Sequence, residues 1–171
     1  MAKEKKTNAV RMIERAKIPY TEHEYECTEF TDGLASTLKT GIPPEKSFKT
    51  LVTRGKSGSY YVLVIPVAEE VDFKKAAKAA GEKSMEMIHV KELTPLTGYI
   101  RGGCSPIGMK KQFPTLLHES AKKFGTIVVS GGRIGLSVEL APDALLSLVR
   151  GQYADLIHNT NSTKEAASPS C

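Results

Sequence analysis

The chain has 171 residues, of which 40% are hydrophobic and 25% are charged, and its formal net charge is +5. This length fits one domain, and the composition is that of a globular protein rather than a disordered chain. No window approaches the roughly 18 apolar residues of a membrane span, and no apolar stretch follows the basic opening MAKEKKTNAV, so we expect a cytoplasmic protein without membrane contact.

The cysteine and histidine patterns argue against disulfides and metals. The three cysteines are odd in number and widely spaced, and the four histidines show no HxxxH spacing. We therefore expect reduced thiols, no metal site and no cofactor. The positive charge permits attraction to phosphates, although solvated lysines are the commoner explanation for such a mild excess.

The sequence of the first part of the chain predicts two helices, a short strand and a hairpin. Thr7–Ala16 has an amphipathic pattern, Tyr20–Tyr25 reads as a short strand, and Asp32–Lys39 reads as a short helix opened by an aspartate. Two β-rich runs, Ser47–Arg54 and Tyr60–Val67, are separated by the turn sequence GKSGS.

The middle of the chain is more irregular. Asp72 is suited to cap a helix through Ala80, and Gly81 is suited to end it. A short strand at Met85–His89 and a short helix at Val90–Leu93 follow. The next stretch, TGYIRGGCSPIGMKK, has no periodicity and much turn chemistry, so it is expected to be an ordered or functional loop.

The last part alternates short strands and helices. The expected elements are strands Thr115–His118, Thr126–Ser130 and Leu136–Leu140, a helical Glu119–Lys123, and a final helix from Pro142 through Val149. Interleaved strands and helices with a clear hairpin predict an α+β fold with a mixed, largely antiparallel sheet. The polar tail predicts one domain at residues 1–159 and a flexible segment at 160–171.

Three stretches carry a resemblance to a known family: SFKTLV, TGYIRGGCSPIGMKK and VSGGRIGLSVELAPDAL. In order and spacing they resemble the YbaK/EbsC family of aminoacyl-tRNA deacylases, from the first helix to about His158. The resemblance implies a six- or seven-stranded, barrel-like sheet with flanking helices, as in the editing domain of bacterial prolyl-tRNA synthetases. It also implies removal of wrongly attached cysteine, chiefly from the proline tRNA, in trans to the synthetase. The aminoacylated 3′ end of tRNA is then the expected partner, and the need for prolyl-tRNA synthetase stays open.

Lys49 and Thr50 are the first candidate site residues. Alternation along SFKTLV places Ser47, Lys49 and Leu51 on one strand face. From periodicity alone, a lysine in the middle of a strand is most often a solvated edge charge. The resemblance implies instead that Lys49 faces the pocket and holds a phosphate or the ester carbonyl, with Thr50 as a secondary polar contact.

Gly102 and Gly103 are candidates for backbone contact with the substrate. A glycine pair lets N–H groups approach a ligand where a Cβ would collide, and two converging amides form an oxyanion cradle. A plain tight turn is the alternative. Gly102 is the better match to the family's catalytic-loop glycine, and the Ser105 hydroxyl can join the cradle. Cys104 has no neighbouring base in the sequence, so we expect a buried structural thiol rather than a nucleophile.

The remaining substrate contacts follow from the resemblance. Ser130 and Gly131 border the pocket, with a hairpin turn as the alternative role. Some members carry an aspartate where this chain has Ser137, which leaves recognition of the aminoacyl amine open. Tyr25 and Phe30 correspond to aromatic residues at the pocket mouth, with core packing as the alternative.

The sequence shows no carboxylate pair, no triad and no activated cysteine. The resemblance offers another nucleophile, the thiol of the esterified cysteine, which attacks its own carbonyl and forms a thiolactone. Holding a near-attack geometry can supply about 7 to 11 kcal/mol. Hydrolytic removal of alanine or another small amino acid, with Lys49 and a bound water, is a first alternative. A non-catalytic binding or regulatory module is a second.

Overall fold

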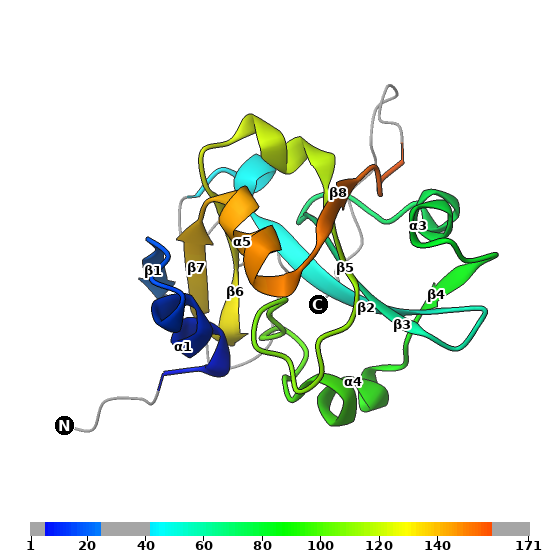
Figure 1. The fold of residues 1–171 in the computed structure, drawn as a ribbon, viewed down its shortest axis with the longest axis horizontal. Coiled ribbons are helices and arrows are strands. Elements are labelled where there is room, and N and C mark those ends of the chain that lie inside the picture. The colour runs from blue at the N-terminus through cyan, green and yellow to red at the C-terminus, as the bar shows by residue number, and fades with distance from the viewer. Residues whose placement is uncertain (1–5, 25–41, 159–171) are drawn as a thin grey trace.

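The computed structural model describes residues 6–24 and 42–158, and the structural findings concern these two ranges. They form an α+β fold in which short helices lie around two β-sheets (Figure 1). The predicted fold class is therefore confirmed. No helix in the two ranges is long and apolar enough to cross a bilayer.

The larger sheet has five strands in the order β4-β2-β3-β5-β8. Strand β2 pairs antiparallel with β3 and β4, while β5 lies parallel to β3 and to β8. The strands are β2 (Phe48–Gly55), β3 (Tyr60–Pro66), β4 (Met85–Met87), β5 (Thr115–His118) and β8 (Gln152–Ala154).

The smaller sheet has three antiparallel strands: β1 (Thr21–Glu24), β7 (Leu136–Leu140) and β6 (Ile127–Arg133). A parallel bridge between Ser47 and Val128 joins it to the larger sheet. The described strands thus form two joined sheets rather than a closed barrel. Eight strands are described instead of the six or seven that the resemblance implied, and β8 was missed because it is short and lacks alternation.

Local sequence explains where the helices begin and end. Thr7 Oγ1 accepts a hydrogen bond from the Val10 N–H at 3.2 Å, and Asp72 caps α3 by accepting from the Lys74 and Lys75 N–H groups. Gly81 ends α3 with a φ of +79°. The helices are α1 (Asn8–Arg15), α3 (Phe73–Ala80), α4 (Val90–Thr97), α5 (Pro142–Val149) and the 3₁₀ helices η1 (Pro44–Lys46) and η2 (Glu119–Lys123).

Helix α4 is longer than the sequence predicted. It was expected to end at Leu93, but it continues through Pro95 to Thr97, and Gly98 ends it with a φ of +84°. The loop therefore begins at Gly98. The helix predicted at Asp32–Lys39 and the tail predicted at 160–171 both lie outside the described residues.

Two clusters of buried side chains hold the sheets in place. One combines both sheets with α1 and α5, through residues such as Val64, Val129 and Leu145. The other lies between the five-stranded sheet and α3, and it includes Leu51, Ile65 and Ala76. Because the two clusters cover opposite faces of β2, both faces of this strand are buried.

Candidate active site

The two sheets bring Lys49, Ser130 and Ser137 onto one face. Ser130 and Ser137 are direct partners on β6 and β7. The bridge between Ser47 and Val128 is parallel, and Lys49 and Ser130 each lie two residues beyond one of its partners, on the same strand face as that partner. Residues paired across neighbouring strands share a face. Three of the predicted site residues therefore form a row across the junction between the sheets.

Lys49 is not a solvated edge charge. Its residue is only 7% exposed, and its partner on β3 is Ile65. On the edge of β2 opposite β3, strand β4 pairs with Thr53–Gly55, and the Ser47–Val128 bridge brings β6 to the other end of this same edge, near Lys49. A lysine is retained at such a buried position only where its ammonium has an acceptor or anion to bind.

Thr50 points the opposite way. Strand alternation puts its side chain on the same face as Phe48 and Val52, which belong to the cluster between the sheets. Thr50 itself is 2% exposed. The structure does not bring the Thr50 hydroxyl together with the Lys49 side chain, and the proposed substrate contact stays a prediction.

Gly102 occupies the third position of a tight turn. The Gly103 N–H donates to the Ile100 carbonyl at 2.9 Å, and Gly102 has a φ of +88°. These are the features of a type II turn, which favours glycine at this position. The Gly103 N–H thus already has an acceptor within the loop. In the proposed cradle of two amides, this N–H would have to donate to the substrate and to Ile100 at once. Gly102 is half-buried and is the glycine of the pair better placed to meet a ligand.

The backbone of Gly103 packs against another backbone segment. A Cβ at Gly103 would lie 2.8 Å from the Arg133 Cα and 2.9 Å from the Ile134 nitrogen. No side chain fits there without moving the turn between β6 and β7. Gly103 therefore holds the loop against this turn. Arg133, the residue that it contacts there, is three residues after Ser130 in the sequence.

Ser130 and Gly131 lie at an irregularity of β6. The pairing with β7 shifts between Ser130 and Arg133, and the Gly132 N–H donates to Ser130 Oγ at 3.2 Å. Ser130 Oγ acts there as an acceptor, so its own hydrogen can be offered to a ligand. Gly131 is buried, and its carbonyl accepts from Thr7 Oγ1 at 2.5 Å. Gly131 therefore fixes the start of α1 to β6.

Ser105 and Cys104 face the interior of the protein. Ser105 is fully buried, and its Oγ accepts from the Ile107 N–H at 3.2 Å. Its hydroxyl thus shapes the loop, and a further contact with substrate stays a prediction. Cys104 is 4% exposed within the core cluster that includes Val129. The expectation of a buried thiol is confirmed for Cys104.

Replacing Cys104 tests its structural role. If the chain has the deacylase activity that the resemblance implies, Cys104→Ala should keep at least about a tenth of its rate, a change in barrier below about 1.4 kcal/mol, because we expect the buried thiol to be structural. It should lower the free energy of unfolding by about 1 kcal/mol through the small cavity that it leaves. Single-turnover kinetics and urea unfolding measure the two effects. A loss of activity by several decades in a folded variant would restore the nucleophile hypothesis.

His23 extends the row, and the sequence did not single it out for function. Its Cα partner on β7 is Ser137, and its Nε2 lies 2.8 Å from Glu139 Oε1. Lys46 Nζ donates to Glu139 Oε2 at 2.8 Å, and the Thr126 hydroxyl donates to the same oxygen. If Nε2 carries the hydrogen toward the carboxylate, Nδ1 is the basic nitrogen of His23. The row thus ends in an imidazole that can accept a proton.

The Lys46, Thr126 and His23 contacts lower the pKa of Glu139 to about 2. Because the folded state favours the ionised carboxylate, these contacts stabilise the protein above about pH 4.5 and lose their effect as the pH falls toward 2. Glu139→Gln should therefore reduce stability by about 1 kcal/mol at pH 7, and by less at pH 3. Urea unfolding at the two pH values checks this, with Glu45→Gln as an exposed control. An equal loss at both pH values would contradict the ionic explanation.

Comparisons with known proteins show the family of this chain. A family model described as "Aminoacyl-tRNA editing domain" matches residues 31–148. This chain belongs to that family. The chain is 52% identical over 162 residues to the "Putative Cys-tRNA(Pro)/Cys-tRNA(Cys) deacylase EbsC" of Enterococcus faecalis, and the match covers 91% of this chain and 98% of that protein.

Two solved structures share the fold of this editing domain. A crystal structure of "a putative trans-editing enzyme for prolyl tRNA synthetase" is 23% identical with a TM-score of 0.77, and it is matched over 91% of this chain and 100% of the other. The "hypothetical protein APE2540" is 19% identical with a TM-score of 0.79, over 89% and 100%. At these identities the likeness shows the fold alone.

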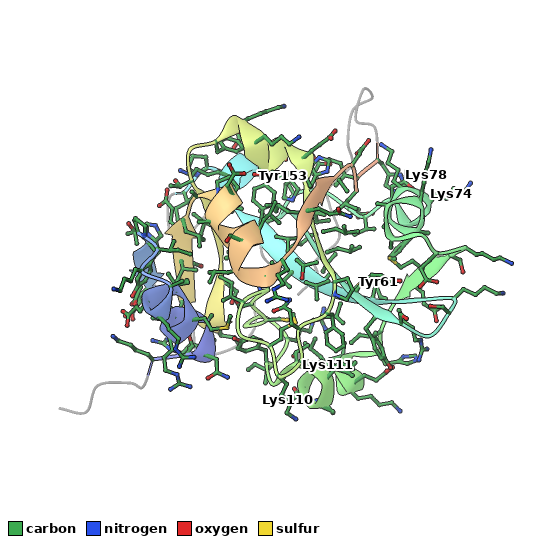
Figure 2. The ribbon with its side chains drawn as sticks, in the orientation of Figure 1. Tyr61, Lys74, Lys78, Lys110, Lys111 and Tyr153 are labelled. Atoms are coloured by element: carbon green, nitrogen blue, oxygen red, sulfur yellow. The ribbon has the colours of Figure 1, made fainter. Side chains whose placement is uncertain are left out.

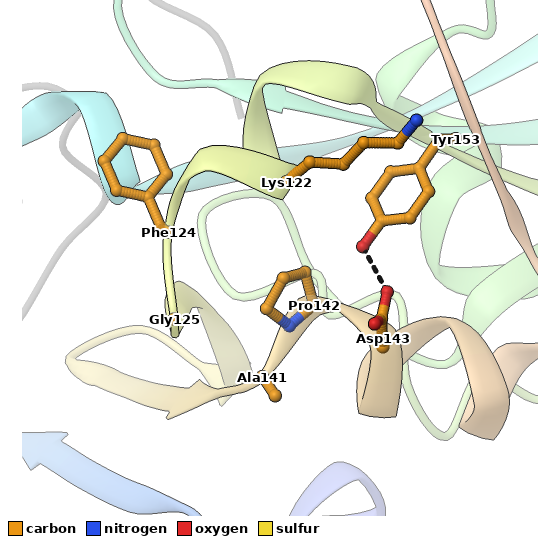
Figure 3. Close-up of a pocket in the computed structure, with 7 residues that line it drawn as sticks. All are labelled: Lys122, Phe124, Gly125, Ala141, Pro142, Asp143 and Tyr153. Atoms are coloured by element: carbon orange, nitrogen blue, oxygen red, sulfur yellow. Dashed lines mark hydrogen bonds between the residues drawn. The ribbon is translucent and has the colours of Figure 1, made fainter.

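The editing domain also has a pocket of about 490 Å³ away from the row (Figure 3). It lies between η2, the start of α5 and β8, where the Tyr153 hydroxyl donates to Asp143 Oδ1 at 2.6 Å and Lys122 Nζ lies 4.9 Å from the Tyr153 ring centroid. None of the predicted site residues lines it. Tyr25 and Phe30 lie outside the described residues, and within the described ranges no group of three potential metal ligands occurs.

Proposed function

We propose that this editing domain is a trans-editing deacylase that removes cysteine from misacylated tRNA, chiefly Cys-tRNA(Pro). The observation that carries the proposal is the row of Lys49, Ser130 and Ser137, with the Gly102 loop packed beside the β6–β7 turn. A buried lysine on the same face as two hydroxyls suits an ester whose carbonyl gains negative charge during cleavage. Aminoacyl-tRNA is present in the cytoplasm, which is the location we propose.

In the proposed reaction, the thiol of the esterified cysteine is the nucleophile. Its sulfur forms a bond to its own carbonyl carbon, the bond from that carbon to the tRNA oxygen breaks, and the thiol proton ends on the tRNA hydroxyl. The products are a thiolactone and uncharged tRNA. Lys49 stabilises the charge on the carbonyl oxygen, and Ser130 and Ser137 orient the amino acid. Cys104, the only cysteine in the described ranges, is buried and unsuited to attack.

Hydrolysis of alanyl-tRNA or another small aminoacyl-tRNA is the second candidate, and the His23–Glu139 pair is the observation that favours it. An imidazole held by a carboxylate can activate a water molecule. No hydrogen bond joins Ser137 to His23 in the described part of the chain, so Ser137 is not arranged as a conventional serine nucleophile. This reaction would not need a substrate thiol.

The decisive test of the function is the release of labelled amino acid from proline tRNA charged with cysteine, alanine or serine. Each ester is incubated with the protein alone and with prolyl-tRNA synthetase added. We expect cysteine to be released fastest. Preferred release of alanine would favour the hydrolytic candidate, and no release above the spontaneous rate in either condition would favour a non-catalytic module. The synthetase arm determines whether that enzyme is a required partner.

A further inference from the structure

We propose that Arg101, Lys110 and Lys111, here called the loop cations, bind backbone phosphates of the tRNA acceptor end that enters the candidate site. The proposal rests on the function proposed above and adds the surface that holds the nucleic acid. Between Glu92 and Glu119 the chain has no aspartate or glutamate, while it carries these three cations. The segment that contains the Gly102 turn is therefore purely basic, although acidic residues are common elsewhere in the chain.

The loop closes on itself and displays the cations. The Lys110 N–H donates to the Thr97 carbonyl at 2.9 Å, so the two ends of the loop meet. All three cations are exposed. Figure 2 shows Lys110 and Lys111 close to α4, with Lys110 at the rim of the molecule.

Lys110 and Lys111 make only weak contacts within the protein. Lys110 Nζ donates to the Pro95 carbonyl at 3.3 Å, and Lys111 Nζ lies 5.9 Å from the Phe113 ring centroid. Neither forms a salt bridge with an acidic side chain of the described residues. Lys6, Lys46 and Lys75, by contrast, are each paired with a carboxylate. The two loop lysines thus keep their charge available for an external anion.

The position of the loop fits a nucleic acid attached to the scissile ester. Gly103 touches the backbone of Arg133, which is three residues from Ser130. Given the reach of an extended chain, the backbone of Arg101 lies within roughly 20 Å of Ser130. Every nucleotide of the tRNA 3′ end carries a phosphate, so several phosphates fall within this distance of the ester.

The chemistry favours phosphates over an acidic protein surface. An editing domain must accept tRNAs through their common backbone, and exposed lysines without a shaped apolar pocket provide contacts that are independent of sequence. Such contacts weaken with salt, by a slope in log K of about 0.7 to 0.9 per neutralised phosphate. Removal of two loop cations should thus leave a measurable mark on the salt dependence of tRNA binding.

The experiment compares Lys110→Gln/Lys111→Gln with a matched control, Lys74→Gln/Lys78→Gln. The control lysines are equally exposed but lie on α3, in a different region of the molecule (Figure 2). Binding of uncharged proline tRNA is measured from 50 to 300 mM salt. The loop variant should bind about tenfold more weakly at 150 mM salt, and its salt slope should fall by about 1.5. The control should behave like the unmodified protein. An unchanged salt slope in the loop variant would overturn the proposal. The loop cations would then be better explained as a surface that binds an acidic protein.

A second measurement separates phosphate contact from damage to the catalytic loop. Cysteine esterified to adenosine has the same reacting ester but no phosphate. The loop variant should lose about tenfold in kcat/KM with Cys-tRNA(Pro) and less than twofold with cysteinyl-adenosine. Equal losses on both substrates would mean that the lysines shape the loop, contrary to the proposal. Because the binding experiment uses uncharged tRNA, it tests the loop cations even if the deacylase function fails its own test.

Discussion

Lys49→Met should lower the single-turnover rate of Cys-tRNA(Pro) deacylation by at least 100-fold. Lys49 shares a strand face with Ser130 and Ser137, and loss of a group that stabilises a developing oxyanion costs roughly 3 to 4 kcal/mol of barrier. Methionine is chosen because Lys49 is 93% buried, so alanine would also leave a cavity.

Two measurements keep this result interpretable. Lys56→Met removes an exposed lysine from the turn of the same β2–β3 hairpin, and it should keep full activity. The thermal midpoint of Lys49→Met should lie within a few degrees of the unmodified protein. If the folded Lys49→Met variant retained full activity, Lys49 would have no part in catalysis.

Cysteinyl-tRNA should be cleaved at least 100-fold faster than seryl-tRNA on the same tRNA body. Serine has nearly the same size as cysteine, but a thiol ionises near pH 8.5 and a hydroxyl does not ionise in this range, so only cysteine supplies a strong internal nucleophile. A thiolactone should be the first product with cysteinyl-tRNA. Rapid quenching at low pH followed by mass spectrometry detects it. Comparable rates for cysteinyl, seryl and alanyl esters would instead favour a water held by the protein.

Methylation of the substrate sulfur is an independent control for the second prediction. S-methylcysteinyl-tRNA should compete with cysteinyl-tRNA at similar affinity and remain uncleaved, because its sulfur cannot form the thiolactone. Failure to compete would show that the added methyl group blocks binding. The role of the thiol would then be judged from the rates of the cysteinyl and seryl esters alone. Cleavage of the methylated ester at the cysteinyl rate would contradict attack by the thiol.

The predictions that succeeded rest on local chemistry. The β2–β3 hairpin, the Asp72 cap and the Gly81 end of α3 depend on a few adjacent residues, and all three occur in the structure. Helix α4 departs from its prediction because Pro95 reads as a stop in a sequence, whereas the structure tolerates it near the end of a short helix.

The site could be predicted only in part because it depends on contacts between distant segments. Strand alternation predicts on which face of β2 the Lys49 side chain lies. Only the bridge between Ser47 and Val128 shows that β6 lies next to this end of β2. His23 was missed because its partner Glu139 is 116 residues away. Matching polar residues on the predicted strands at Tyr20–Tyr25 and Leu136–Leu140 would have been the only signal in the sequence.

The glycine pair shows how one pattern can serve two roles. The sequence indicated that Gly102 and Gly103 both allow a ligand to approach the backbone. In the structure, Gly103 allows the approach of Arg133 instead, and only Gly102 has the positive φ. A sequence cannot distinguish a backbone that approaches a ligand from one that approaches another strand, because both require the missing Cβ.

A single-turnover time course of Cys-tRNA(Pro) with the protein in excess tests directly whether this editing domain is a cysteinyl-tRNA deacylase. Uncharged tRNA should be released at least 100-fold faster than by spontaneous hydrolysis, and Lys49→Met should be close to the spontaneous rate. Release by the unmodified protein at only the spontaneous rate, with prolyl-tRNA synthetase present or absent, would contradict a cysteinyl-tRNA deacylase.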